Sequence, residues 1–116
     1  MSLQHVEGFD EAIQKMGDIL FEYVASALNG KAWNCACFHE RNNFSKLRIT
    51  MSDGTLNADL SSPRRQGNFF VYLSKVRDMK DQFAKRWQGF KLTVFPDGKC
   101  KVQLDYDESD PNFFDS

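Results

Sequence analysis

The sequence predicts an α+β fold, in which about five antiparallel strands form one sheet and two helices cover one of its faces. In two segments the apolar residues recur every three or four positions, and in the others they alternate with polar residues. The order along the chain is α-β-β-β-α-β-β. One sheet with both helices on the same face buries every apolar stripe at once. With 116 residues the chain has the usual size of one compact domain, so we expect residues 1–116 to form a single domain.

The first helix is predicted over residues 9–28, where the apolar side chains form a single stripe. Asp10 and Glu11 stand in its first turn, where carboxylates meet the positive end of the helix dipole. Asn29-Gly30 ends it, because glycine readily adopts the left-handed conformation that closes a helix.

The second helix is predicted from Asn68 to Arg86, after a loop over residues 61–67 that we expect to be exposed. Its inward stripe is Phe69, Leu73, Val76, Met79 or Lys80, Phe83 and Trp87.

Three strands are predicted between Ala32 and Leu60, where the apolar period changes to two. The pair Asp53-Gly54 favours a tight hairpin between the second and third strands, since its central residues need a positive φ. The residues expected to share a face are Trp33, Cys35 and Cys37 in the first strand, Leu47, Ile49 and Met51 in the second, and Leu56, Ala58 and Leu60 in the third.

A final hairpin is predicted from Trp87 to Tyr106, with its turn at Pro96-Asp97-Gly98. Its returning strand should bury one face, formed by Cys100, Val102, Leu104 and Tyr106, and expose Lys99, Lys101, Gln103 and Asp105. Residues 107–116 are expected to form a frayed acidic tail.

Charge is strongly segregated along the chain, although the net charge is only -1. Residues 1–30 sum to -4, residues 31–101 to +8 and residues 102–116 to -5. In one interpretation the acidic ends fold back over the basic middle. In the other, the acidic residues face a basic partner. The sequence leaves both open.

The chain has no apolar run near the ~20 residues that span a bilayer, and its N-terminus lacks a signal-like pattern. Its three cysteines are an odd number, which favours reduced thiols and hence a cytoplasmic protein. Cys35, Cys37 and His39 share one side of a strand and are the best metal candidates, but their spacing is not that of structural zinc loops. We therefore predict no metal and no cofactor.

Catalytic motifs are weak. A Cys-His nucleophilic pair has no third orienting group nearby, and no phosphate-binding glycine loop is present. The acidic run at the C-terminus lacks the glycine-centred loop of a calcium site. Among large aromatics, Phe38 and Phe70 lie off the apolar stripes of their own elements and are predicted to be exposed partner anchors.

The last hairpin, Phe90-Lys91-Leu92-Thr93-Val94 to Pro96-Asp97-Gly98-Lys99 and then Leu104-Asp105-Tyr106-Asp107, resembles the YezG-like immunity proteins. The N-terminal amphipathic helix, the Trp-bearing strand and the helix ending at Trp87 extend the resemblance over most of the chain. It implies a small cytosolic protein, not an enzyme. Such a protein binds and blocks the toxic C-terminal domain of a polymorphic or contact-dependent bacterial toxin, often a nuclease.

Nucleases bind a polyanion, so their clefts tend to be basic, and carboxylates can imitate phosphates there. We therefore expect Asp105, Asp107, Glu108 and Asp110 to contact the toxin, with Phe38 and Phe70 as apolar anchors. The alternatives are a nucleic-acid-binding module that uses the basic middle segment, and a small enzyme built on Cys35, Cys37 and His39.

Overall fold

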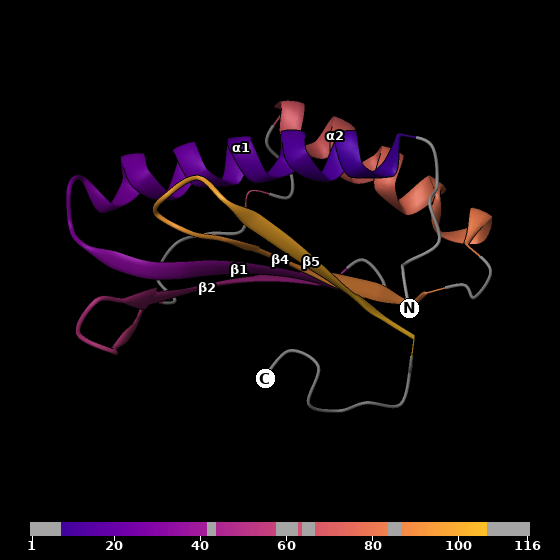
Figure 1. Cartoon of the computed structure of the whole chain (residues 1–116). Helices are drawn as coiled ribbons and strands as arrows, with labels where there is room; N and C mark the ends of the chain where they lie inside the picture. The colour runs from indigo at the N-terminus through magenta and orange to yellow at the C-terminus, as the bar shows by residue number, and fades with distance from the viewer. Residues whose placement is uncertain (1–7, 42–43, 58–62, 64–66, 84–86, 107–116) are drawn as a thin grey trace.

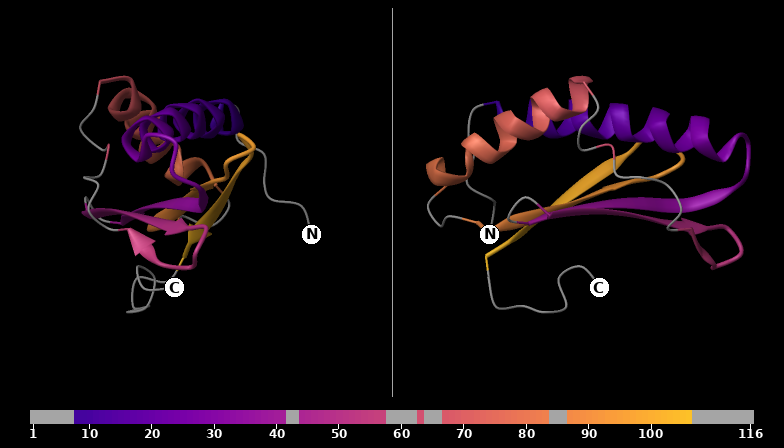
Figure 2. Two further views of the ribbon diagram at one scale, coloured as in Figure 1. Left: turned by 90° about the vertical axis from the view of Figure 1, so that its left-hand side faces the viewer. Right: turned by 180° about the vertical axis from the view of Figure 1, so that it is seen from behind.

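The computed structural model describes residues 8–41, 44–57, 63, 67–83 and 87–106 of the chain. Two helices lie on one side of a five-stranded antiparallel sheet, as predicted (Figure 1). The two further views show both helices on that same side (Figure 2). The structure is therefore a two-layer α+β sandwich with one face of its sheet turned away from the helices.

The helices are α1 (Phe9–Leu28) and α2 (Gly67–Asp78), followed by a short 3-10 turn at Lys80–Gln82. The predicted bounds of α1 are confirmed, and Asn29 ends the helix in the left-handed conformation at φ 50°. The α-helical part of α2 is shorter than predicted. Beyond Asp78 the chain continues as a 3-10 turn, and the predicted end at Arg86 lies outside the described residues.

The strands are β1 (Trp33–Arg41), β2 (Phe44–Met51), β3 (Leu56–Asn57), β4 (Gly89–Val94) and β5 (Cys100–Asp105). Their order across the sheet is β3-β2-β1-β4-β5, and the neighbours along it are antiparallel. The predicted positions 58 and 60 of the third strand, like most of the loop after them, lie outside the described residues.

Every second residue of the central strands faces the helices. Phe38 and Phe90 are fully buried there, and Phe38 packs edge-on against Phe69 of α2 at 5.0 Å between ring centroids. Trp87 packs edge-on against Phe90 at 5.8 Å. The predicted inward stripe of the second helical segment is buried at Phe69, Leu73, Val76, Phe83 and Trp87, and Met79 is partly buried against the same core.

The structure corrects the predicted faces at several positions. Leu56 and Tyr106, which were expected to face inward, are exposed, and Asp105, which was expected to be exposed, is buried. The first strand also departs from its predicted face. The register of β1 against β2 shifts between Trp33 and Cys35, so these two residues do not share a face as expected. Trp33 packs towards α1, with its ring 6.0 Å from that of Phe21, whereas Cys35 lies opposite Thr50. Regular alternation counted from Trp33 missed the shift, because such an irregularity depends on how the neighbouring strand pairs.

Candidate functional site

The candidate site is the open face, which we define as the side of the sheet opposite the helices. Strand pairing arranges its side chains in three rows across β2, β1, β4 and β5. Cross-strand partners share a face, so each row follows directly from the register. The rows are Arg48, Cys37, Thr93 and Lys101; then Lys46, His39, Lys91 and Gln103; and then Phe44, Arg41, Gly89 and Asp105.

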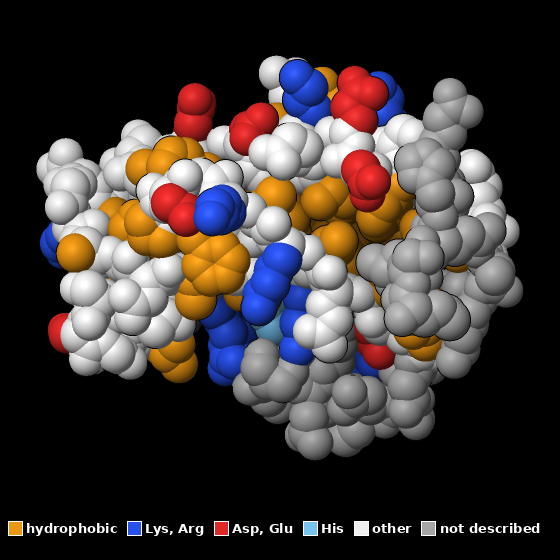
Figure 3. Space-filling view, in the orientation of Figure 1, with side chains coloured by type: hydrophobic (Ala, Val, Ile, Leu, Met, Phe, Trp, Pro, Cys, Tyr) orange, Lys and Arg blue, Asp and Glu red, His pale blue; other side chains and the backbone are white. Residues whose placement is uncertain are grey.

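The open face is cationic. Its three rows hold five Lys or Arg side chains and one carboxylate, a net charge of +4. Figure 3 shows Lys and Arg side chains gathered at the lower centre of the molecule, while most of the acidic side chains in that view lie over the helices. Within the described residues, the open face thus contrasts with the exposed side of α1, which carries Asp10, Glu11, Asp18 and Glu22 against Lys15 alone.

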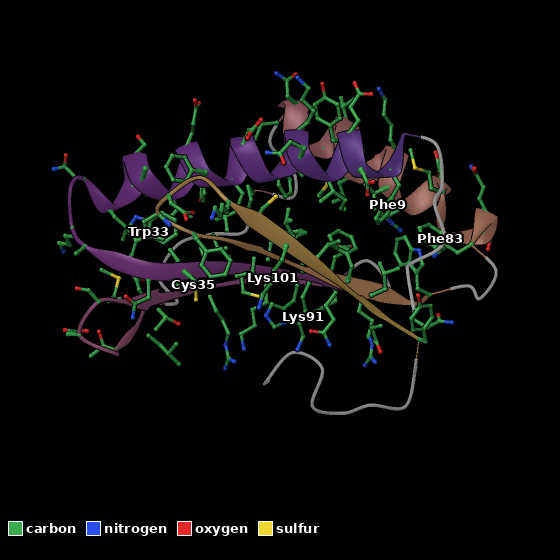
Figure 4. The ribbon with its side chains drawn as sticks, viewed as in Figure 1. Phe9, Trp33, Cys35, Phe83, Lys91 and Lys101 are labelled. Atoms are coloured by element: carbon green, nitrogen blue, oxygen red, sulfur yellow. The ribbon has the colours of Figure 1, made fainter. Side chains whose placement is uncertain are left out.

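A hollow of about 550 Å³ lies on this face over β4 and β5. Lys91 and Lys101 point into the space on this side of the strands, away from the helices (Figure 4). Cys37, Thr93 and Gln103 contribute its other polar groups. The hollow is lined by two ammonium groups beside a hydroxyl, an amide and a thiol. This arrangement suits the binding of a carboxylate or another anion.

At the end of the third row Asp105 forms an ion pair with Arg41. The Nε of Arg41 donates a hydrogen bond of 2.8 Å to Oδ2 of Asp105, and a second bond comes from Nη2. Gly89 stands between the two residues in the register, so no side chain separates them. Two strand ends that are 64 residues apart in the sequence are joined in this way.

This ion pair corrects the expectation that Asp105 faces a partner. The residue is only 7% exposed, and its carboxylate binds a cation of the chain's own basic middle segment. For this residue the fold-back interpretation of the charge pattern is the right one. Asp107, Glu108 and Asp110 lie outside the described residues.

The two predicted aromatic anchors differ in their exposure to solvent. Phe38 is not exposed as expected but is fully buried between Phe69 and Phe90, because its position on β1 faces the helices. Phe70 is 47% exposed on α2, as predicted. Phe44, which the sequence did not single out, is 65% exposed on the open face. The alternation of β2 around buried Leu47 could have indicated it.

Cys35, Cys37 and His39 do share the open face, as predicted. Within the described residues no group of three or more His, Cys, Asp or Glu is arranged to hold a metal ion. The three cysteines are free thiols. Burial raises the pKa of the Cys37 thiol, and the hydrogen bond from Thr93 and the charge of Lys91 oppose that shift only in part. A thiol held protonated in this way is a poor nucleophile at neutral pH.

Cys100 lies on the other face, where α1 passes close to β5. A Cβ placed on Gly17 would be 3.0 Å from its sulfur, so the absence of a side chain at Gly17 permits this approach. Burial and the nearby Asp18 raise the pKa of the Cys100 thiol. Neither Cys37 nor Cys100 therefore has the lowered pKa that activates a catalytic cysteine.

Comparison with protein-family models and with curated proteins finds no match to this chain. No helix in the described part of the chain is both long and apolar enough to cross a membrane.

Proposed function

We propose that this protein is a cytoplasmic immunity protein that binds a bacterial toxin domain, most simply a nuclease, and blocks its active site or substrate surface. It acts by binding, without cofactor or catalytic residues of its own. The observation that carries the proposal is the β4–β5 hairpin, whose sequence resembles the YezG-like immunity proteins and whose last strand leads directly into the acidic segment.

The layout of the domain supports a binding role. Both helices cover one face of the sheet, which leaves the opposite face of four strands to present charged and polar side chains in ordered rows. Phe70 adds an exposed aromatic ring on the helix layer. Large aromatics and charged groups on a rigid scaffold are typical of surfaces that recognise another protein.

The acidic residues beyond β5 are the proposed contacts with the toxin. Because Asp105 forms an ion pair with Arg41, the proposed contacts with the toxin are the acidic residues that follow it in the sequence, Asp107, Glu108 and Asp110. Complementary charge at such an interface mainly raises the rate of association, and buried apolar contacts mainly set the rate of dissociation.

The test begins with the gene next to this one, which should encode a secreted protein with a toxic C-terminal domain. The two products should co-purify, and the immunity protein should protect cells that express the toxin domain. If the purified toxin domain neither binds this protein nor is inhibited by it, the proposal is wrong.

A second experiment tests the acidic contacts. Neutralising them as Asp107→Asn, Glu108→Gln and Asp110→Asn should slow toxin capture about tenfold at low salt and flatten its salt dependence. The matched control removes the same charge from the exposed side of α1, as Glu11→Gln, Asp18→Asn and Glu22→Gln. If both triple variants capture the toxin at the same rate, the acidic segment does not steer association.

The second candidate function is nucleic-acid binding, and the gathering of basic side chains on the open face favours it. It predicts retention of RNA or DNA on a filter at low salt, falling steeply as salt is added. No retention would exclude it. The face differs from a sheet that stacks bases. Its central positions on β1 and β4 are Cys37, His39, Lys91 and Thr93, with no Phe, Tyr or Trp among them, and the His39 ring is fully buried.

A further inference from the structure

The open face and the end of the chain have complementary charge. The three rows carry a net charge of +4, and residues 107–116 hold four acidic side chains and no Lys or Arg. The acidic residues are Asp107, Glu108, Asp110 and Asp115. An extended acidic peptide therefore has the chemistry that this face would recognise.

The chain leaves the described part of the structure at the edge of this same face. Asp105 occupies the last position of the third row, and its ion pair with Arg41 holds the end of β5 at the open side of the sheet. The acidic residues that follow Asp105 in the sequence therefore begin at the edge of the face that carries the cations. The next two cations on β4 and β5 are Lys91 and Lys101, which both line the hollow.

The segment of residues 107–116 is long enough to cross the open face. Ten extended residues reach about 33 Å, whereas the three spacings that separate β5 from β2 amount to about 14 Å. Residues 107–116 could therefore cross the whole face and reach Lys46 and Arg48 on β2. The segment also contains Phe113 and Phe114, for which the exposed ring of Phe44 in the third row offers an apolar contact.

We propose that the open face is a binding surface for an acidic peptide, and that its occupant in the free protein is the chain's own residues 107–116. The covalent connection of residues 107–116 to β5 favours this segment over a separate partner, because a short tether gives an effective concentration in the millimolar range. The inference goes beyond the immunity function and does not depend on it. If the immunity function and this inference are both correct, the carboxylates of residues 107–116 leave the cationic open face when they bind the basic toxin.

The first test compares the full chain with a chain ended at Tyr106, by the backbone amide NMR spectra of both proteins. Removing residues 107–116 should shift the resonances of Cys37, Lys91 and Lys101 and leave those of the exposed side of α1 unchanged. Shifts confined to the last residues of β5 would overturn the proposal.

The second test uses the segment as a separate ligand. A fluorescent peptide of residues 107–116 should bind the chain ended at Tyr106, and more weakly as salt is raised. Lys91→Glu with Lys101→Glu should weaken this binding at least tenfold. The control, Lys15→Glu with Lys31→Glu, makes the same charge change at exposed positions on and after α1 and should have little effect.

Equal weakening by the two double variants would show that only net charge matters and would overturn the assigned surface. Circular dichroism of each variant establishes that it is folded.

A full chain that dimerises with rising concentration, and no longer dimerises when it ends at Tyr106, would show that the segment binds a second copy. A single-stranded DNA that binds the full chain as tightly as the truncated one would show that the face is not occupied by the segment. Either result would overturn the intramolecular occupant. The toxin enters none of these measurements, so their failure leaves the proposed function untouched.

Discussion

Neighbouring residues of β1 show how differently the two faces of the sheet are determined. Phe38 points to the helices and is packed between Phe69 and Phe90, whereas His39, which is also fully buried, lies on the open face in a row with Lys46 and Lys91. The helix-facing side is specified by apolar burial, which is strong and non-directional. The open side is specified by charge and by cross-strand register. Stability should therefore depend mostly on the first face and recognition on the second.

The largest expected effect comes from removing a ring on the buried face. Phe38→Ala should lower the free energy of unfolding by about 3 to 5 kcal/mol, because it leaves a cavity between two aromatic rings. The matched change on the open face, Phe44→Ala, should cost about 1 kcal/mol or less, since that ring is 65% exposed. Urea denaturation of both variants measures the difference. Equal losses would contradict the contrast between the faces.

The ion pair, like His39, belongs to the buried part of the open face. Asp105→Asn should cost about 2 to 3 kcal/mol, because the Arg41 guanidinium keeps its charge and loses its carboxylate. Replacing both partners, as Arg41→Met with Asp105→Leu, should recover part of that loss. A double-mutant cycle by urea denaturation gives the coupling between them. A coupling near zero would mean that the pair adds nothing to stability.

Gly89 tests how closely β4 and β1 approach beside that pair. A Cβ at this position would lie 2.3 Å from the carbonyl oxygen of Glu40, so Gly89→Ala must displace backbone. We expect a loss of about 1 to 3 kcal/mol. Gly67→Ala is the control, because a Cβ there meets nothing within 4 Å. A thermal unfolding series that ranks the two variants equally would contradict the close approach.

The smallest effect concerns thiol chemistry on the two faces. Burial raises the pKa values of both Cys37, on the open face, and Cys100, under α1. The reactive thiolate therefore forms only at higher pH than in a free cysteine, and alkylation by iodoacetamide at pH 8 should be slower than that of a small thiol. Thr93→Val removes a hydrogen bond that lowers the pKa of Cys37 and should slow its alkylation further. Peptide mass spectrometry against time and pH measures both rates. Faster labelling of Cys37 than of the free thiol would be the contrary result.

The proposed function assigns the two charged regions different tasks. In the two proposals taken together, the acidic residues after β5 carry the charge that suits a basic toxin cleft, and the open face binds them before the toxin does. A toxin must then compete with the face for the same carboxylates. Such competition would weaken binding to weakly basic surfaces more than to a strongly basic cleft, which favours the cognate partner.

The elements that depend on local pattern follow directly from the order of residues. The apolar stripe of residues 9–28, the left-handed stop at Asn29 and the Asp53-Gly54 turn are short-range signals, so the fold class and the bounds of α1 follow from them. The inward positions of the second helical segment follow from the same periodicity. The short end of α2 did not, because neighbouring packing decides where a helix yields to a 3-10 turn.

Tertiary structure alone decided which residues face each other across the sheet. The register shift after Trp33, the burial of Phe38 and the pairing of Arg41 with Asp105 all depend on neighbouring strands. A change of one position in register moves a side chain to the opposite face, and the pattern within β1 alone did not show where its pairing shifts. The acidic end was visible in the sequence as a possible surface for a partner. Folding joined its first carboxylate to the chain's own basic segment, at the corner of a cationic face that the sequence showed only as scattered charges.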